Sequence, residues 1–156
     1  MIAVVQRCLR GSVRVAGEIV GSLVPQGGLV VLLGIEVGDS PTCAQRFADK
    51  LAKLRIFEDS EGKMNLSVSD AGGSLLIVSQ FTLAGDCSGG NRPSFMNAAR
   101  PEVAEPLVQE VVDGLRARGL HVETGRFLTE MEVEIVNDGP VTLVLRVPPT
   151  TDGNPA

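Results

Sequence analysis

The stretch "EIVNDGPVTLVLRV", residues 134–147, places a turn signal between two runs of alternating apolar residues. An Asp-Gly pair between two such runs is typical of a tight β-hairpin. Here Pro140 follows the pair, and proline has no N–H group with which to close a hairpin hydrogen bond. The pattern therefore predicts a strand on each side of residues 137–140. It leaves open what a Gly-Pro step does at this point.

Apolar segments elsewhere predict the rest of a sheet. Two continuous apolar runs, residues 27–37 and 72–85, lie between glycines and are typical of buried central strands. Shorter alternating segments with polar or glycine breaks predict further strands. These segments are "MIAVVQR" (1–7), "SVRVAG" (12–17), "EIVGSL" (18–23), "HVETG" (121–125), "MEVEIV" (131–136) and "VTLVLRV" (141–147).

Two helices are predicted between the strands. Ser40 followed by Pro41 is a favourable helix start, and apolar residues then recur at helical spacing as far as Leu54. Pro101 opens a second helix, which Gly119 ends. We expect an α/β fold with a mixed, curled, barrel-like sheet and two main helices. Because two helices cannot cover both faces of a large sheet, we expect the sheet either to curl or to pair with a second subunit.

Length and composition indicate one domain. The chain has 156 residues, 44% of them hydrophobic, and residues 1–147 have the pattern of a single core. Residues 148–156 lack an apolar anchor and are expected to be a disordered tail. No apolar run is long enough to span a bilayer, and the first residues do not resemble a signal peptide. We therefore expect a cytoplasmic protein that does not contact membranes.

Few residues suit metal or redox chemistry. The three cysteines, Cys8, Cys43 and Cys87, are far apart in sequence, which favours reduced thiols. His121 is the one histidine of the chain, and it has no close ligand pair beside it. We expect no metal and no cofactor.

The charge pattern allows two interpretations of the first strand. A net charge of -5 argues against broad, non-specific nucleic-acid binding. Arg7, Arg10 and Arg14 nevertheless lie close together in a segment without acidic residues. They form either a local basic patch or simply the solvated edge of a strand, and charge alone favours the edge.

Candidate catalytic residues are few. His121 stands at a helix-to-strand junction, where a surface role is more common, and Cys87 stands in a loop without a nearby base. Ser79, Gln80 and Thr82 end an otherwise apolar strand, so they are either the point where the strand leaves the core or the floor of a pocket. In a pocket, the backbone N–H groups near Phe81 and Thr82 could hold an oxyanion.

Such a pocket would lack a strong general base. It could accelerate ester hydrolysis if the substrate supplied its own activating group. The loop "NRPSF", residues 91–95, would lie beside it.

Four short motifs together resemble the D-aminoacyl-tRNA deacylases. They are "SQFTL" (79–83), "RPSF" (92–95), "TGRF" (124–127) and "NDGPVT" (137–142), in this order. The opening 15 residues and "RIFEDSEGKMNLSV" (55–68) fit the same family, so the resemblance runs from residue 1 to residue 147. The glycine-rich loop "LAGDCSGGN" (83–91) departs from the common family pattern.

The resemblance implies a homodimer that exchanges a loop. In this family the Gly-Pro bond is cis, and the loop enters the active site of the other subunit. By analogy, Gly139 and Pro140 meet residues 79–82 of the partner, and their carbonyl groups hold the α-amino group and α-hydrogen of the substrate. An L side chain would collide with this backbone, whereas a D side chain would not. The remaining implied residues are Asn137, Val141 and Thr142 in the loop, Arg92, Pro93, Ser94 and Phe95 at the rim, and Arg7 on tRNA.

The resemblance also implies a reaction. The substrate is the ester of a D-amino acid with the terminal ribose of tRNA, and the neighbouring 2′-hydroxyl group takes part in hydrolysis. Ser79, Gln80 and the amide of Phe81 would hold the ribose and the carbonyl group, and Thr82 would donate or accept hydrogen bonds rather than act as a nucleophile. Glycine has no side chain to reject, so glycyl-tRNA formed on alanine tRNA should also be cleaved.

Two other classes of function stay open. A non-catalytic module could bind an RNA end through Arg7, Arg10 and Arg14, and it would protect the ester. A thiol hydrolase would use Cys87, and alkylation of that thiol would stop it.

Overall fold

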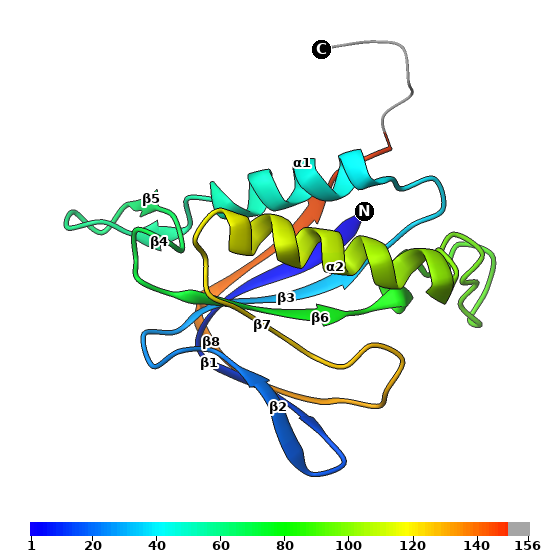
Figure 1. Ribbon diagram of the computed structural model, residues 1–156, viewed down its shortest axis with the longest axis horizontal. Coiled ribbons are helices and arrows are strands. Elements are labelled where there is room, and N and C mark those ends of the chain that lie inside the picture. Colours follow the sequence, from blue (N-terminus) through cyan, green and yellow to red (C-terminus); the bar gives the residue numbers. More distant parts are fainter. Residues whose placement is uncertain (150–156) are drawn as a thin grey trace.

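Six strands form one curled sheet, and two helices lie against one of its faces (Figure 1). The structure is a computed structural model that describes residues 1–149, so most of the expected tail, residues 150–156, lies outside the described part. The elements are β1 (Ile2–Val15), β2 (Glu18–Ser22), β3 (Gly28–Gly34), α1 (Pro41–Ala52), β4 (Phe57–Glu58), β5 (Met64–Leu66), β6 (Ser74–Ser79), the 3₁₀ helix η1 (Phe81–Ala84), α2 (Pro101–Ala117), β7 (Val122–Thr124) and β8 (Glu132–Arg146).

The sheet combines antiparallel and parallel neighbours. Its strand order is β2-β1-β3-β6-β7, and β8 pairs with β1 outside this path. Strand β1 is antiparallel to β2, β3 and β8, whereas β3, β6 and β7 are parallel to one another. Parallel neighbours need crossover connections, which α1 and α2 provide. The expected mixed, barrel-like α/β fold with two main helices is confirmed. Strands β4 and β5 form a separate two-stranded hairpin.

Both predicted helices are confirmed, and the expected residues begin them. The Ser40 side chain accepts a hydrogen bond of 3.4 Å from the amide of Cys43, and Pro41 is the first helical residue of α1. Helix α2 begins at Pro101, and Gly119 follows its end with a φ of +80°. In the described part of the chain, no helix is long and apolar enough to cross a membrane.

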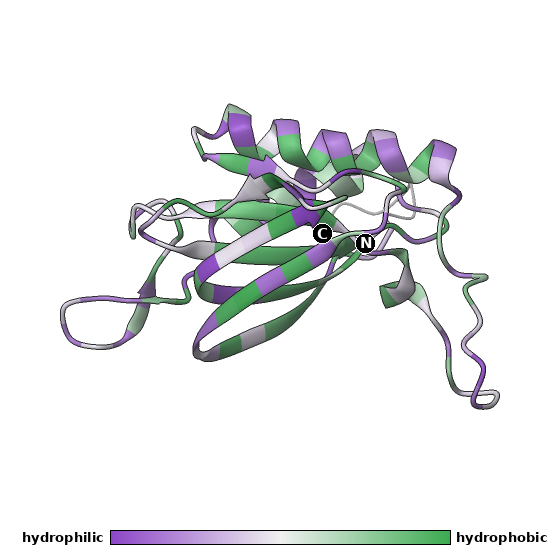
Figure 2. Cartoon of the chain, turned by 90° about the horizontal axis from the view of Figure 1, so that it is seen from below, coloured by the Kyte–Doolittle hydropathy of each residue, from purple (hydrophilic) through white to green (hydrophobic). Residues whose placement is uncertain are grey.

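Two hydrophobic clusters lie on opposite sides of the sheet. The larger one fills the space between the helices and the sheet, with Phe47 and Leu115 fully buried in it. The smaller one lies inside the curl of the sheet and includes Val13, Val30 and Leu76. Figure 2 shows long apolar stretches in the strands beneath the helices, whereas the helices alternate between hydrophilic and hydrophobic residues. Burial on both faces explains why β3 and β6 are continuous apolar runs.

Four segments that were predicted as separate strands form two long strands in the structure. The segments 1–7 and 12–17 form the single strand β1, and the segments 131–136 and 141–147 belong almost entirely to the single strand β8. The two long strands pair along nearly their whole length. The expected break at the Gly-Pro step is therefore not a chain reversal.

The Gly-Pro step forms a bulge within β8. Arg7 pairs with Val141, but its neighbour Cys8 pairs with Asn137, so residues 138–140 have no partner on β1. The side-chain oxygen of Asn137 accepts a hydrogen bond of 3.2 Å from the amide of Val141 and so closes the bulge. The Gly139-Pro140 peptide bond is cis. Proline needs no N–H group here, because its residue does not belong to the hydrogen-bonded ladder.

Candidate active site

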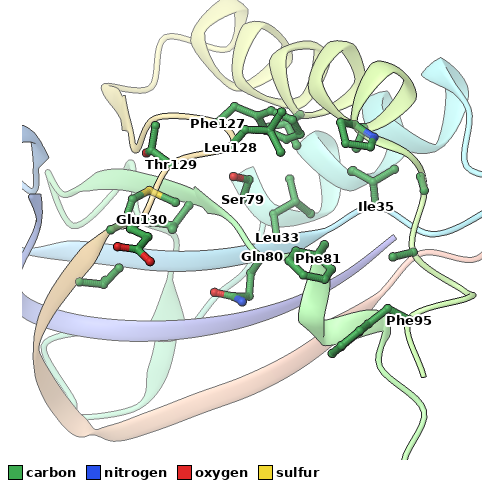
Figure 3. A pocket seen from close by; sticks show the side chains of 18 residues that line it. Leu33, Ile35, Ser79, Gln80, Phe81, Phe95, Phe127, Leu128, Thr129 and Glu130 are labelled. Carbon is green, nitrogen blue, oxygen red and sulfur yellow. The ribbon is translucent and has the colours of Figure 1, made fainter. Parts of the chain in front are cut away.

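A cavity of about 710 Å³ opens where β6 leaves the sheet. Three parts of the chain form its walls: the end of β6 with the start of η1, the first turns of α2, and the segment between β7 and β8 (Figure 3). Most of the lining side chains are apolar, and a few polar groups stand among them. Concave, mostly apolar sites with a few placed polar groups are typical of ligand binding.

The polar end of β6 reaches the cavity because the sheet holds it there. The amide of Gln80 donates a hydrogen bond of 2.7 Å to the carbonyl of Leu33, which extends the β3–β6 pairing by one residue. A Cβ atom on Gly34 would lie 2.9 Å from the carbonyl oxygen of Gln80, so only glycine allows this approach. The chain then turns into η1, whose first amides have no acceptor within the helix. Those of Phe81 and Thr82 can therefore serve an oxyanion.

Ser79, Gln80 and Phe81 all line the cavity, but Thr82 does not. Thr82 is exposed beside the cavity, and its hydroxyl oxygen accepts a hydrogen bond from the Gln80 side chain. The arrangement orients the amide of Gln80 through Thr82. It offers hydrogen bonds to a bound ester, and it contains no histidine or cysteine.

Phe95 alone of the four expected rim residues lines the cavity. Its ring stands edge-on to that of Phe81, with centroids 5.2 Å apart and planes at 69°. A Cβ atom on Gly85 would come within 2.9 Å of the Phe95 ring, so the glycine makes room for this pair. Arg92, Pro93 and Ser94 lie in the exposed loop that leads to Phe95, and they are not among the lining residues.

Sequence reasoning missed the wall formed by residues 127–131. Leu128 lines the cavity with 74% of its side chain exposed, and its φ of +56° is uncommon for a residue other than glycine. The Thr129 hydroxyl donates a hydrogen bond of 3.0 Å to the carbonyl of Arg126, which fixes this turn. The "TGRF" motif ends at Phe127, and nothing in it indicated which cavity the turn after it would border.

The loop residues of β8 do not line the cavity of their own chain. Gly139 and Pro140 are exposed, and neither Asn137, Val141 nor Thr142 is among the lining residues. Gly139 has a φ of +118°, and a Cβ atom there would lie 2.8 Å from the amide nitrogen of Val141. The bulge therefore presents bare backbone at the surface, in a conformation that only glycine adopts without strain.

Arg7 is not part of an exposed basic patch, because its side chain is buried. Its side chain is 6% exposed, whereas Arg10 is an exposed residue. The guanidinium group donates a hydrogen bond of 2.7 Å to the carbonyl of Ile56. Its Nε atom lies 2.9 Å from Oδ2 of Asp138, an ion pair in which the N–H direction misses the carboxylate and no hydrogen bond forms. These contacts hold the guanidinium group of Arg7 against the bulge of β8.

The other candidate groups lie away from the cavity. His121 is exposed, with its Nε2 atom 3.5 Å from Glu123, and Cys87 is exposed in the loop before the rim. Cys8 is buried beside the bulge, and burial raises the pKa of its thiol. Among residues 1–149 no group of three potential ligands could hold a metal ion.

The residues that match a known family model extend from 4 to 146, and that model describes the D-Tyr-tRNA(Tyr) deacylases. The chain belongs to this deacylase family. A D-aminoacyl-tRNA deacylase of Symbiobacterium thermophilum is 59% identical over 143 residues, which are 92% of this chain and 93% of that protein. The corresponding protein of Brevibacillus brevis is 57% identical over 145 residues, which are 93% and 99% of the two chains.

Solved structures agree with this deacylase fold. A c-Myc DNA unwinding element binding protein superimposes with a TM-score of 0.86 at 40% identity, covering 95% of this chain and 99% of the other. A probable eukaryotic D-amino acid tRNA deacylase superimposes with a TM-score of 0.78 at 17% identity, covering 92% and 97%. The second comparison supports the fold alone.

Proposed function

We propose that this deacylase cleaves the ester of a D-aminoacyl-tRNA and releases the free D-amino acid and tRNA. The observation that carries the proposal is the apolar cavity of about 710 Å³ with Ser79, Gln80 and Phe81 at its polar end. In the reaction water attacks the ester carbonyl, the bond to the ribose oxygen breaks, and that oxygen takes up a proton. The family membership and the names of its relatives support the same reaction.

The proposed role of the protein is to orient the ester and stabilise negative charge. No histidine or cysteine lines the cavity within the described residues, so a neighbouring ribose 2′-hydroxyl group is proposed to assist the attack. The Phe81 amide and the side chains of Ser79 and Gln80 would hold the carbonyl and ribose. Positioning and preorganised hydrogen bonds can each lower a barrier by several kcal/mol, on the order of 3 or more.

The selection of D-amino acids is proposed to reside in the bulge of β8 and to operate across a homodimer. Gly139 and Pro140 would enter the partner's cavity, where their carbonyl groups face the α-carbon of the substrate. Val141 and the Asn137 side chain close the bulge, and Thr142 follows it, so the presented backbone cannot rotate away as a side chain could. An L side chain would collide with that backbone. Glycine carries no side chain, so glycyl-tRNA on alanine tRNA would be cleaved.

The remaining parts of the proposal concern the surroundings of the site. The acceptor end of tRNA would pass the loop of residues 91–95, where the side chain of Arg92 is exposed and free to contact a phosphate group. Because the proposed substrate is an aminoacyl-tRNA, the proposed location of the protein is the cytoplasm. Neither a metal nor a cofactor is required by the proposed reaction.

A second candidate function is nucleic-acid binding without catalysis. The observation that favours it is the 40% identical solved structure, which is described as a DNA unwinding element binding protein. Arg10 and Arg14 would then be the contacts, since Arg7 is buried. This candidate predicts that the protein protects an aminoacyl ester instead of cleaving it.

The experiment that tests the proposal measures release of labelled tyrosine from matched D- and L-tyrosyl-tRNA at equal concentration. We expect rapid release from the D ester, release from glycyl-tRNA of alanine specificity, and no release from the L ester beyond the spontaneous rate. If a folded protein cleaves none of them and slows spontaneous hydrolysis, the binding candidate replaces the hydrolase. Full resistance of glycyl-tRNA at enzyme levels that clear the D ester would contradict selection by exclusion.

A further inference from the structure

The cavity contains one charged side chain. Of the residues that line it, all but Glu130 are apolar or carry an uncharged polar group. Within residues 1–149 the carboxylate of Glu130 has no hydrogen-bond or ion-pair partner. A carboxylate that lines an apolar cavity without a partner is available to a cation that enters it.

Glu130 stands on the polar side of the cavity. It follows Leu128 and Thr129 and lies two residues before Glu132, the first residue of β8. Figure 3 shows Ser79, Gln80 and Glu130 toward one side of the view and Phe95 toward the other. The carboxylate therefore lines the same cavity as Ser79 and Gln80, the side chains proposed to hold the ester.

We propose that the carboxylate of Glu130 binds the α-ammonium group of the aminoacyl ester, an inference that rests on the proposed function. The reacting end of an aminoacyl-tRNA carries one positive charge, on the α-ammonium group, while its terminal ribose and base are neutral. Glu130 is exposed, so water screens part of this charge pair, and the expected effect on binding is modest. Glu130 is thus a residue that selects esters with a free α-ammonium group.

This role is compatible with the carbonyl groups proposed to come from the partner's loop. An ammonium group has three N–H donors, so it can bind two carbonyl oxygens and one carboxylate oxygen together. Carbonyl groups accept hydrogen bonds but carry no net charge. Glu130 would supply the negative charge that those carbonyl groups lack.

A second electrostatic effect works in the opposite direction and permits a sharp control. Because tRNA is a polyanion, removal of any nearby carboxylate should favour tRNA binding. Glu132, two residues further on, is exposed and does not line the cavity. Glu132→Gln therefore reports the general effect of one lost charge, and Glu130→Gln reports that effect together with the loss of the ammonium contact.

The test compares two esters at pH 7: D-tyrosyl-tRNA and its desamino counterpart, 3-(4-hydroxyphenyl)propionyl-tRNA. We expect Glu130→Gln to raise KM for D-tyrosyl-tRNA about threefold to tenfold, with kcat changed by less than about twofold, as for a partly exposed charge pair. The same variant should leave KM for the desamino ester unchanged or lower it. Glu132→Gln should raise neither KM.

A binding measurement separates this inference from the proposed function. The probes are the non-hydrolysable amide of D-tyrosine with 3′-amino-3′-deoxyadenosine and its desamino counterpart, titrated by calorimetry. If the wild type cleaves no ester but prefers the charged amide, and Glu130→Gln abolishes the preference, then the proposed function fails and the ammonium site stands. If Glu130→Gln weakens both amides equally, behaves like Glu132→Gln, or no amide binds, the ammonium site is overturned.

Discussion

The Nε atom of Arg7 lies 2.9 Å from Oδ2 of Asp138, and this ion pair joins β1 to the base of the bulge in β8. The same guanidinium group donates to the carbonyl of Ile56, a buried residue of the larger hydrophobic cluster. The bulge is thereby tied to the core, although Gly139 and Pro140 at its tip are exposed. An exposed loop with a buried tie can be held in one position without being covered.

Arg7→Lys should destabilise the fold. A lysine cannot reproduce the fork that reaches Ile56 and Asp138 together, so a buried carbonyl and a carboxylate lose their partner. We expect the free energy of unfolding to fall by about 2–3 kcal/mol. Urea denaturation measures it, with Arg10→Lys at an exposed position as the control, for which we expect a change below about 0.5 kcal/mol. Equal stability of the two variants would contradict the tie.

Gly139→Ala should lower the free energy of unfolding more than Gly17→Ala does. Both glycines have a positive φ, +118° and +84°, but a Cβ atom on Gly139 would clash with Val141 while nothing lies within 4 Å of one on Gly17. Gly17→Ala therefore measures the backbone cost, about 1 kcal/mol, and Gly139→Ala should add about 1–2 kcal/mol. If the loop acts in the partner's cavity, only Gly139→Ala should also slow D-tyrosyl-tRNA cleavage. The reverse order of stabilities would refute the clash.

Thr82→Ala should retain substantial activity. The Thr82 hydroxyl lies outside the cavity lining and accepts a hydrogen bond from Gln80, so it orients that amide and does not attack the ester. We expect kcat/KM for D-tyrosyl-tRNA within about tenfold of the wild type, because loss of a true nucleophile costs on the order of 10⁴ or more. Ser79→Ala, which changes a residue that lines the cavity, should lower kcat/KM at least as much as Thr82→Ala does. Loss of all turnover by a folded Thr82→Ala protein would assign Thr82 a catalytic role.

Alkylation of the native protein should modify Cys87 and leave the hydrolase active. Cys87 is exposed, whereas Cys8 and Cys43 are buried, and burial raises the pKa of Cys8 and keeps its thiol protonated. Mass spectrometry after iodoacetamide treatment at pH 8 should find one modified cysteine in the wild type and none in Cys87→Ser. Inactivation of the wild type together with an inactive Cys87→Ser variant would instead favour the thiol mechanism.

The elements whose sequence carries a strong local signal were predictable. Ser40 and Pro41 cap α1 as expected, and the apolar runs of β3 and β6 are buried between two layers. The bulge could not be predicted, because an Asp-Gly pair is compatible both with a hairpin, which reverses the chain, and with a bulge, which does not. Only the pairing of Arg7 with Val141 and of Cys8 with Asn137 decides between them.

The polar end of β6 was predictable as part of the site, and the rest of the wall was not. Ser79 and Gln80 stand out because they interrupt an apolar strand. Leu128 and Glu130 lie in a turn whose composition resembles that of many surface turns, and only the packing of α2 over the sheet brings that turn to the cavity. The burial of Arg7 could not be predicted, because a charged residue on a strand usually faces solvent and its partners come from distant segments.

The bulge in β8 changes the face of the sheet on which alternate side chains of the strand lie. Before it, Val133 and Ile135 pack inside the curl of the sheet, and after it, Val141 and Leu145 pack under the helices on the opposite face. Strand β1 changes faces at the same level, because it skips Leu9. Each strand therefore inserts an odd number of unpaired residues, three in β8 and one in β1. Deleting one of the three unpaired residues of β8 would turn the apolar side of residues 141–147 toward solvent. Deleting or inserting two residues would keep that side under the helices.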